Sequence, residues 1–99
     1  MNVDELTAAM TEKLEDNSSL NSIVKFNFGD EGIITLDGSG GAIVVSNDDL
    51  DADCTVNVSL DDFNEIIEGS LNAQMAFMMG KLKVEGDMGI AMQLGQILG

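Results

Sequence analysis

The order of helix and strand patterns along the chain predicts an α+β fold, in which helices cover one face of a five-stranded, mostly antiparallel sheet. A helical pattern of apolar residues opens the sequence, and four short segments of alternating apolar and polar residues follow it. Two helical patterns, a fifth strand pattern and a last helical pattern complete the chain. With 99 residues, of which 44% are hydrophobic, we expect a single domain over residues 1–99.

The first helix is predicted over residues 2–16, because apolar side chains recur there at helical spacing and share one face. These side chains are Val3, Leu6, Met10 and Leu14. The sequence Asn-Ser-Ser at residues 17–19 is expected to end the helix.

Alternating apolar residues predict strands at residues 23–28, 33–37, 42–46 and 54–58. The first three are joined by short turn segments, which favours an antiparallel meander. The second turn, D-G-S-G-G at residues 37–41, has a glycine cluster, but a strand pattern follows it. A dinucleotide-binding loop requires a helix at that point, so we interpret the cluster as a hairpin turn.

The last third of the chain holds five of the seven methionines, between Met75 and Met92. Ser59 and Asn72 are predicted to cap two short helices, a strand is expected over residues 81–85, and Asp87 should cap a last helix that ends near residue 98. Methionine side chains adapt to irregular space. The segment therefore fits two interpretations, the lining of a pocket for a flexible apolar guest or an ordinary packed core.

An acidic loop is expected at residues 47–53, where Asp49, Asp51 and Asp53 have the spacing that opens a calcium-binding loop. Cys54 stands where such a loop requires glycine, and Leu60 stands where it requires glutamate. We therefore interpret the segment as a solvated loop without a bound metal.

The charge balance restricts the partners of the protein. The sequence contains eighteen acidic residues and four lysines, so the formal net charge is −14. Nucleic acid is excluded as a partner, and binding to anionic membranes should be weak or absent. The chain has no histidine, and its one cysteine, Cys54, has no basic neighbour in sequence and should be buried on a strand, so we expect neither catalysis nor a cofactor. An unpaired cysteine and the lack of a basic leader favour a cytoplasmic location.

Residues 76–88 read A-F-M-M-G-K-L-K-V-E-G-D-M, which resembles the signature A-F-x-x-G-K-L-K-(I/V)-x-G-(N/D)-M of the sterol carrier protein two family. The resemblance implies the strand order 3-2-1-4-5 and an apolar tunnel between the sheet and the helices. It also implies binding of fatty acids, fatty acyl-CoA, sterols or phospholipids without a fixed cofactor.

The expected function is thus non-catalytic lipid binding and transfer, with a fatty acid or fatty acyl-CoA as the ligand. The residues expected to line the tunnel are Phe63, Ile66, Ile67, Gln74, Met75, Met78, Met79, Leu82, Met88, Ala91, Met92 and Gly95. Lys81 and Lys83 alternate outward and could meet a headgroup only at the tunnel mouth. The alternative is a protein-interaction or dimerisation module that uses the apolar last helix. A monomer or a weak homodimer is expected.

Overall fold

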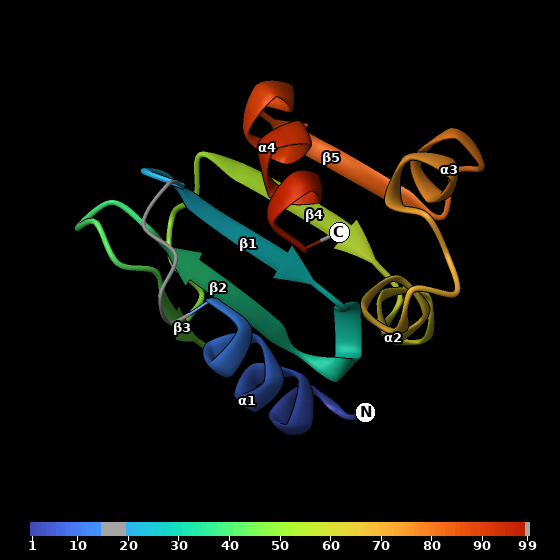
Figure 1. The fold of residues 1–99 in the computed structure, drawn as a ribbon, viewed down its shortest axis with the longest axis horizontal. Coiled ribbons are helices and arrows are strands. Elements are labelled where there is room, and N and C mark those ends of the chain that lie inside the picture. Colours follow the sequence, from blue (N-terminus) through green and yellow to red (C-terminus); the bar gives the residue numbers. More distant parts are fainter. Residues whose placement is uncertain (15–19, 99) are drawn as a thin grey trace.

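The computed structural model describes residues 1–14 and 20–98, with side-chain surroundings given as far as Gln93 (Figure 1). The elements, in chain order, are α1 (Val3–Leu14), β1 (Ile23–Asn27), the short 3₁₀ helix η1 (Gly29–Glu31), β2 (Ile33–Asp37), β3 (Val44–Ser46), β4 (Cys54–Val58), α2 (Leu60–Glu68), α3 (Ala73–Met78), β5 (Leu82–Gly86) and α4 (Met88–Leu98). The segment predicted to end α1, residues 17–19, lies outside the described residues.

The five strands form one sheet in the order β3-β2-β1-β4-β5. β1 pairs antiparallel with β2, β2 with β3, and β4 with β5, whereas β1 and β4 run parallel. The predicted α+β class, the meander and the strand order are therefore confirmed. β3 is shorter than predicted, because Asp37 closes a turn by accepting hydrogen bonds from the Ser39 amide and hydroxyl, and pairing resumes only at Val44.

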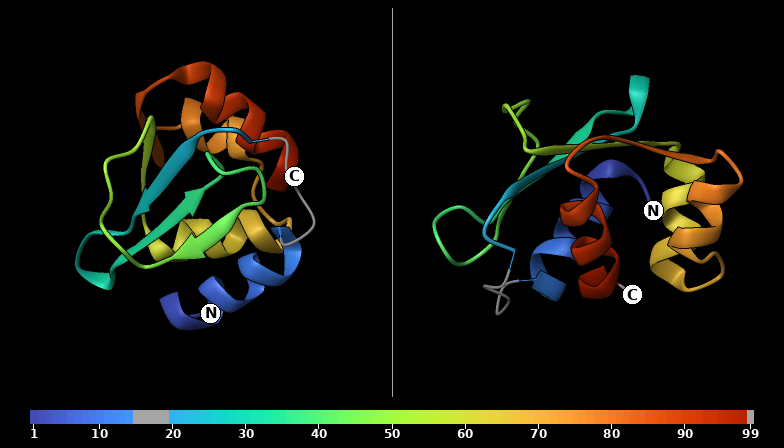
Figure 2. Two further views of the ribbon diagram at one scale, coloured as in Figure 1. Left: turned by 90° about the vertical axis from the view of Figure 1, so that its left-hand side faces the viewer. Right: turned by 90° about the horizontal axis from the view of Figure 1, so that it is seen from above.

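The helices lie on one side of the sheet, as the view from above shows (Figure 2). On this side, α1 packs against β2 and β3, whereas α4 packs against β4 and β5. The inner face of α1 is the predicted one, with Leu6, Met10 and Leu14 buried against the sheet. Three phenylalanine rings join the sheet to α2, because the ring centroids of Phe26 and Phe28 lie 4.8 and 5.2 Å from that of Phe63.

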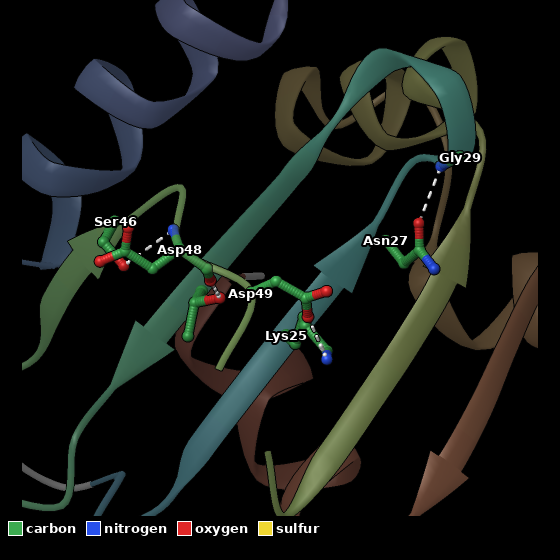
Figure 3. A network of polar contacts seen from close by, with 7 residues as sticks. Lys25, Asn27, Gly29, Ser46, Asp48 and Asp49 are labelled. Atoms are coloured by element: carbon green, nitrogen blue, oxygen red, sulfur yellow. Dashed lines mark hydrogen bonds and ion pairs between the residues drawn. The ribbon is translucent and has the colours of Figure 1, made fainter. Parts of the chain in front are cut away.

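The opposite face of the sheet is polar and carries the acidic loop. The Lys25 ammonium pairs with the Asp49 carboxylate at 2.6 Å (Figure 3). The buried Thr35 hydroxyl donates to the Asp48 carbonyl at 2.5 Å. The Asp53 carboxylate accepts from the Ile23 amide at 3.0 Å and so ties the loop end to β1. Within the described ranges, no three His, Cys, Asp or Glu side chains gather closely enough to hold a metal ion.

Cys54 lies on the helix-covered face of β4 and is fully buried, as predicted. Burial raises the pKa of its thiol, and the nearby Asp87 carboxylate raises it further. A buried thiol that keeps its proton is a poor nucleophile. None of the helices in the described part of the chain is long and apolar enough to cross a membrane.

Candidate functional site

A cavity of about 590 Å³ lies between the helices and the β1–β4–β5 half of the sheet. Its floor consists of neighbouring side chains on three strands, since Phe26 pairs with Val56 and Val56 with Val84. Side chains of α2, α3 and α4 form its walls. Most of the lining is apolar, so the cavity suits an apolar ligand of small-molecule size.

The wall made by α2 and α3 depends on local capping signals. The Ser59 hydroxyl accepts a hydrogen bond from the Asp62 amide at 3.1 Å and starts α2, and Gly69 ends it in the left-handed conformation with φ 84°. The Asn72 side chain then accepts from the amides of Gln74 and Met75 at 2.8 and 3.4 Å. Two short helices meeting at a sharp turn therefore enclose this end of the cavity.

The opposite wall depends on the junction between β5 and α4. Gly86 has φ 98°, and a Cβ atom at this position would overlap the Asp53 carbonyl oxygen. The same carbonyl accepts from the Asp87 amide at 3.1 Å, and the Asp87 carboxylate accepts from the Gly89 amide at 2.8 Å. This junction directs α4 back over the sheet, so that Met88 and Met92 reach the cavity.

Eight of the twelve predicted site residues line this cavity. They are Phe63, Ile66, Ile67, Gln74, Leu82, Met88, Ala91 and Met92. The structure therefore brings together residues from four elements that the sequence separates by up to 29 positions. Gly95 belongs to the part of α4 whose side-chain surroundings are outside the described residues.

Three predicted residues, Met75, Met78 and Met79, do not line the cavity and are not packed in the core either. They are 57%, 83% and 57% exposed, and Ala76 is the buried residue of α3. The reason is that α3 is apolar around most of its girth, so its sequence pattern does not specify an inner face. A small alanine lets the helix approach the sheet closely, and the longer methionines then point outward.

The sequence did not reveal the charged residues at the cavity. Lys13, from the last turn of α1, and Glu68, from the end of α2, both line it. Lys81 and Lys83, which the sequence offered as headgroup contacts, are exposed and lie outside the lining. Lys13 precedes Leu14, a residue of the buried face of α1, and only the packing of α1 beside the cavity brings its side chain there.

The described geometry defines a class of protein, a small α+β domain with an apolar ligand cavity between its sheet and its helices. The chain belongs to the SCP-2 sterol transfer family, whose model matches residues 3–99. Lipid binding and transfer is the general activity that this membership supports.

Two curated relatives each match more than half of the chain. "Sterol carrier protein 2" of Homo sapiens is 45% identical over 56 residues, which cover 57% of this chain and 10% of that protein. "Peroxisomal multifunctional enzyme A" of Dictyostelium discoideum is 43% identical over 65 residues, 66% of this chain and 15% of that protein. The chain thus corresponds to a small part of these longer proteins, and the word enzyme in the Dictyostelium name describes that longer protein.

Solved structures have the same fold over nearly the whole chain. The apo form of sterol carrier protein 2 from Yarrowia lipolytica is 29% identical, with a TM-score of 0.76 over 94% of this chain and 86% of that one. Sterol carrier protein domain 2 of Helicoverpa armigera is 27% identical, with a TM-score of 0.79 over 97% and 84%. A structure from Aedes aegypti described as palmitated SCP2L2 is 19% identical, with a TM-score of 0.74 over 99% and 95%, and shows the fold alone.

Proposed function

We propose that residues 1–99 act as one non-catalytic lipid-binding domain that holds the acyl chain of a fatty acid or fatty acyl-CoA in the cavity. The observation that carries the proposal is the apolar cavity of about 590 Å³ between the sheet and the helices. Ligand pockets in proteins range over roughly 300–1,000 Å³, so the cavity is of suitable size for a small amphiphile. Membership of the family and the palmitated relative agree with this proposal.

The energetics require little polar anchoring. An acyl chain with ~14 methylenes contributes a gross ~11 kcal/mol on burial, at ~0.8 kcal/mol each. Association costs on the order of 4–15 kcal/mol, so micromolar affinity can arise from the acyl chain alone. The flexible Met88 and Met92 side chains at the cavity can adapt to chains of different length.

The lining also supports an anionic headgroup. Lys13 is the cationic side chain at the cavity, and within the described residues it makes no ion pair. Gln74, which also lines the cavity, carries an amide that can donate hydrogen bonds. Glu68 is the opposing charge, and it should disfavour a headgroup placed near α2. We therefore place the carboxylate or phosphate group of the ligand on the α1 side.

Displacement of a fluorescent fatty acid tests both parts of the proposal. Palmitate and the uncharged hexadecanol should both displace the fluorescent ligand from the wild-type protein. Lys13→Met should weaken palmitate binding by roughly twofold to fivefold and leave hexadecanol binding unchanged, because a partly exposed ion pair contributes about 0.5–1 kcal/mol. Lys83→Met is the matched control, since it removes the same charge from an exposed lysine outside the cavity.

The outcomes separate the two claims. Equal losses of palmitate affinity in Lys13→Met and Lys83→Met would contradict the role of Lys13 but would leave the acyl site in place. Failure of both ligands to bind the wild-type protein would contradict the lipid site itself. In that case, a dimer whose formation depends on concentration would favour the alternative function, an interaction module that uses α4.

A further inference from the structure

The strand β5 forms one border of the sheet, and α3 and α4 join it at its two ends (Figure 1). It stands last in the strand order, so within the described residues only β4 pairs with it. Gly86, at the end of β5, is exposed. A strand edge without a partner offers backbone groups to a further strand.

The ladder between β4 and β5 determines which backbone groups of β5 point outward. Pairs in an antiparallel ladder alternate between those that exchange hydrogen bonds and those that do not. The Asp87 amide donates to the Asp53 carbonyl at 3.1 Å, so the odd-numbered residues of β5 bond to β4. Leu82 and Val84 therefore direct their amides and carbonyls away from β4, and no other segment of the described chain bonds to them.

The charges of β5 favour one register for pairing with a second copy of the strand. Antiparallel pairing centred on Val84 places Lys83 opposite the partner's Glu85. It also places Lys81 opposite the partner's Asp87, and the two-fold symmetry repeats both contacts. Moving the centre to Lys83 or to Glu85 would place two like charges directly opposite each other, which is destabilising.

We propose that β5 pairs with β5 of a second copy of this chain in the register centred on Val84, so that the two five-stranded sheets become continuous. Val84 and the partner's Val84 then exchange hydrogen bonds through their outward amides and carbonyls. The contact between Lys83 and the partner's Glu85 falls in a pair without backbone hydrogen bonds, where side chains approach most closely. Directly opposed residues share a face of the sheet, so the helices of both copies lie on the same side of the dimer.

The charge distribution along the chain allows two acidic molecules to meet at this edge. Residues 69–99 hold two acidic residues and two lysines, and all four lie between Lys81 and Asp87. The edge therefore has no net charge, although the whole chain carries −14. The other edge strand, β3, pairs over only three residues and leads into the acidic loop at residues 47–53, so it is a poorer site for a second acidic copy.

Sedimentation velocity over a range of protein concentrations tests the proposal. The wild-type protein should dimerise as its concentration rises. Lys83→Glu and Glu85→Lys should each weaken dimerisation by at least about tenfold, because two attractive cross-strand contacts become repulsive. The variant with both substitutions should dimerise again, since the exchanged charges recreate the contacts. Within β4, Lys83 and Glu85 pair with the uncharged Asn57 and Thr55, so the substitutions break no ion pair there.

Glu12→Lys is the matched control for Glu85→Lys. Glu12 is exposed on α1, which packs against β2 and β3, and its substitution changes the net charge by the same amount. Both variants reduce the overall repulsion between two acidic molecules, and only Glu85→Lys should weaken the dimer.

Oxidative cross-linking tests the register. A mixture of Lys83→Cys and Glu85→Cys should give a disulfide-linked dimer, whereas either variant alone should give little, and Cys54 is buried away from the edge. Efficient cross-linking of one variant alone would overturn this register. A wild-type protein that stays monomeric would overturn the proposal, as would a dimer that Lys83→Glu and Glu85→Lys leave intact or that the double substitution fails to restore.

Discussion

At the scale of single residues, Gly86 shows how one position fixes the site. Gly86→Ala should destabilise the protein by roughly 2–4 kcal/mol, because its φ of 98° is unfavourable for alanine and the added Cβ would overlap the Asp53 carbonyl oxygen. Gly40→Ala is the control, since open space surrounds that position, and its effect should stay within about 0.5 kcal/mol. Urea unfolding measures both, and similar stabilities for the two variants would contradict the close contact at the β5–α4 junction.

Cys54 provides a second residue-scale prediction. Because burial and the Asp87 carboxylate raise the pKa of the thiol, the folded protein holds this proton more tightly than the unfolded chain does. The contribution to stability is therefore fully present below the ordinary thiol pKa of 9.0 and is lost as the pH rises through the higher folded value. Urea unfolding of the wild-type protein and Cys54→Ala is measured between pH 7 and pH 10. The free energy of unfolding should fall more steeply with rising pH for the wild-type protein.

The native protein should also react slowly with thiol reagents, since Cys54 is fully buried. Labelling in urea provides the control, because the unfolded chain exposes the same thiol. Rapid labelling under native conditions would contradict the placement of Cys54 on the helix-covered face of β4.

At the scale of elements, the sequence predicts an element well where local chemistry determines it. The capping side chains of Ser59 and Asn72 predict where α2 and α3 begin. The alternation of apolar and polar residues places Cys54, Val56 and Val58 of β4 on one face. The inner face of α3 was not predictable, because its two turns lack a polar side that would orient them. The approach of Lys13 to the cavity was not predictable either, since it depends on how α1 packs in three dimensions.

α4 offers a test that separates a cavity from a packed core. Met92 lines the cavity and is 65% exposed, so Met92→Glu should change the free energy of unfolding by less than about 1 kcal/mol. The same substitution should weaken fatty-acid binding by at least about tenfold, because it places a carboxylate beside the apolar guest. Thermal unfolding and displacement of a fluorescent fatty acid measure the two effects side by side.

Met78→Glu is the control for Met92→Glu, since Met78 is a methionine outside the lining and should keep normal fatty-acid affinity. A folded Met92→Glu that binds the fluorescent fatty acid normally would contradict the placement of the ligand under α4. An unfolded Met92→Glu would instead favour a solid core at this position.

At the scale of the whole molecule, residues 1–68 carry the net charge of −14, whereas residues 69–99, with two acidic residues and two lysines, carry none. The resemblance carried by the family signature at residues 76–88 implied the strand order, and in the structure that segment supplies the edge strand β5 and the start of α4. The acidic residues could be counted from the sequence, but only the fold shows that α3 and α4, which hold none of them, line the cavity together with Glu68 of α2.

This separation leads to a prediction about anionic membranes. With a formal net charge of −14, the protein should be repelled by anionic vesicles, and the repulsion should be strongest at low ionic strength, where the Debye length is about 30 Å at 0.01 M salt. At about 1 M salt the Debye length falls to roughly 3 Å, so the repulsion is then largely screened. Co-sedimentation with phosphatidylserine-containing vesicles should therefore rise with salt, whereas binding to pure phosphatidylcholine should change little. If the protein bound anionic vesicles strongly at low salt and added salt abolished this binding, the contact would be attractive and basic. That result would contradict this account of the surface.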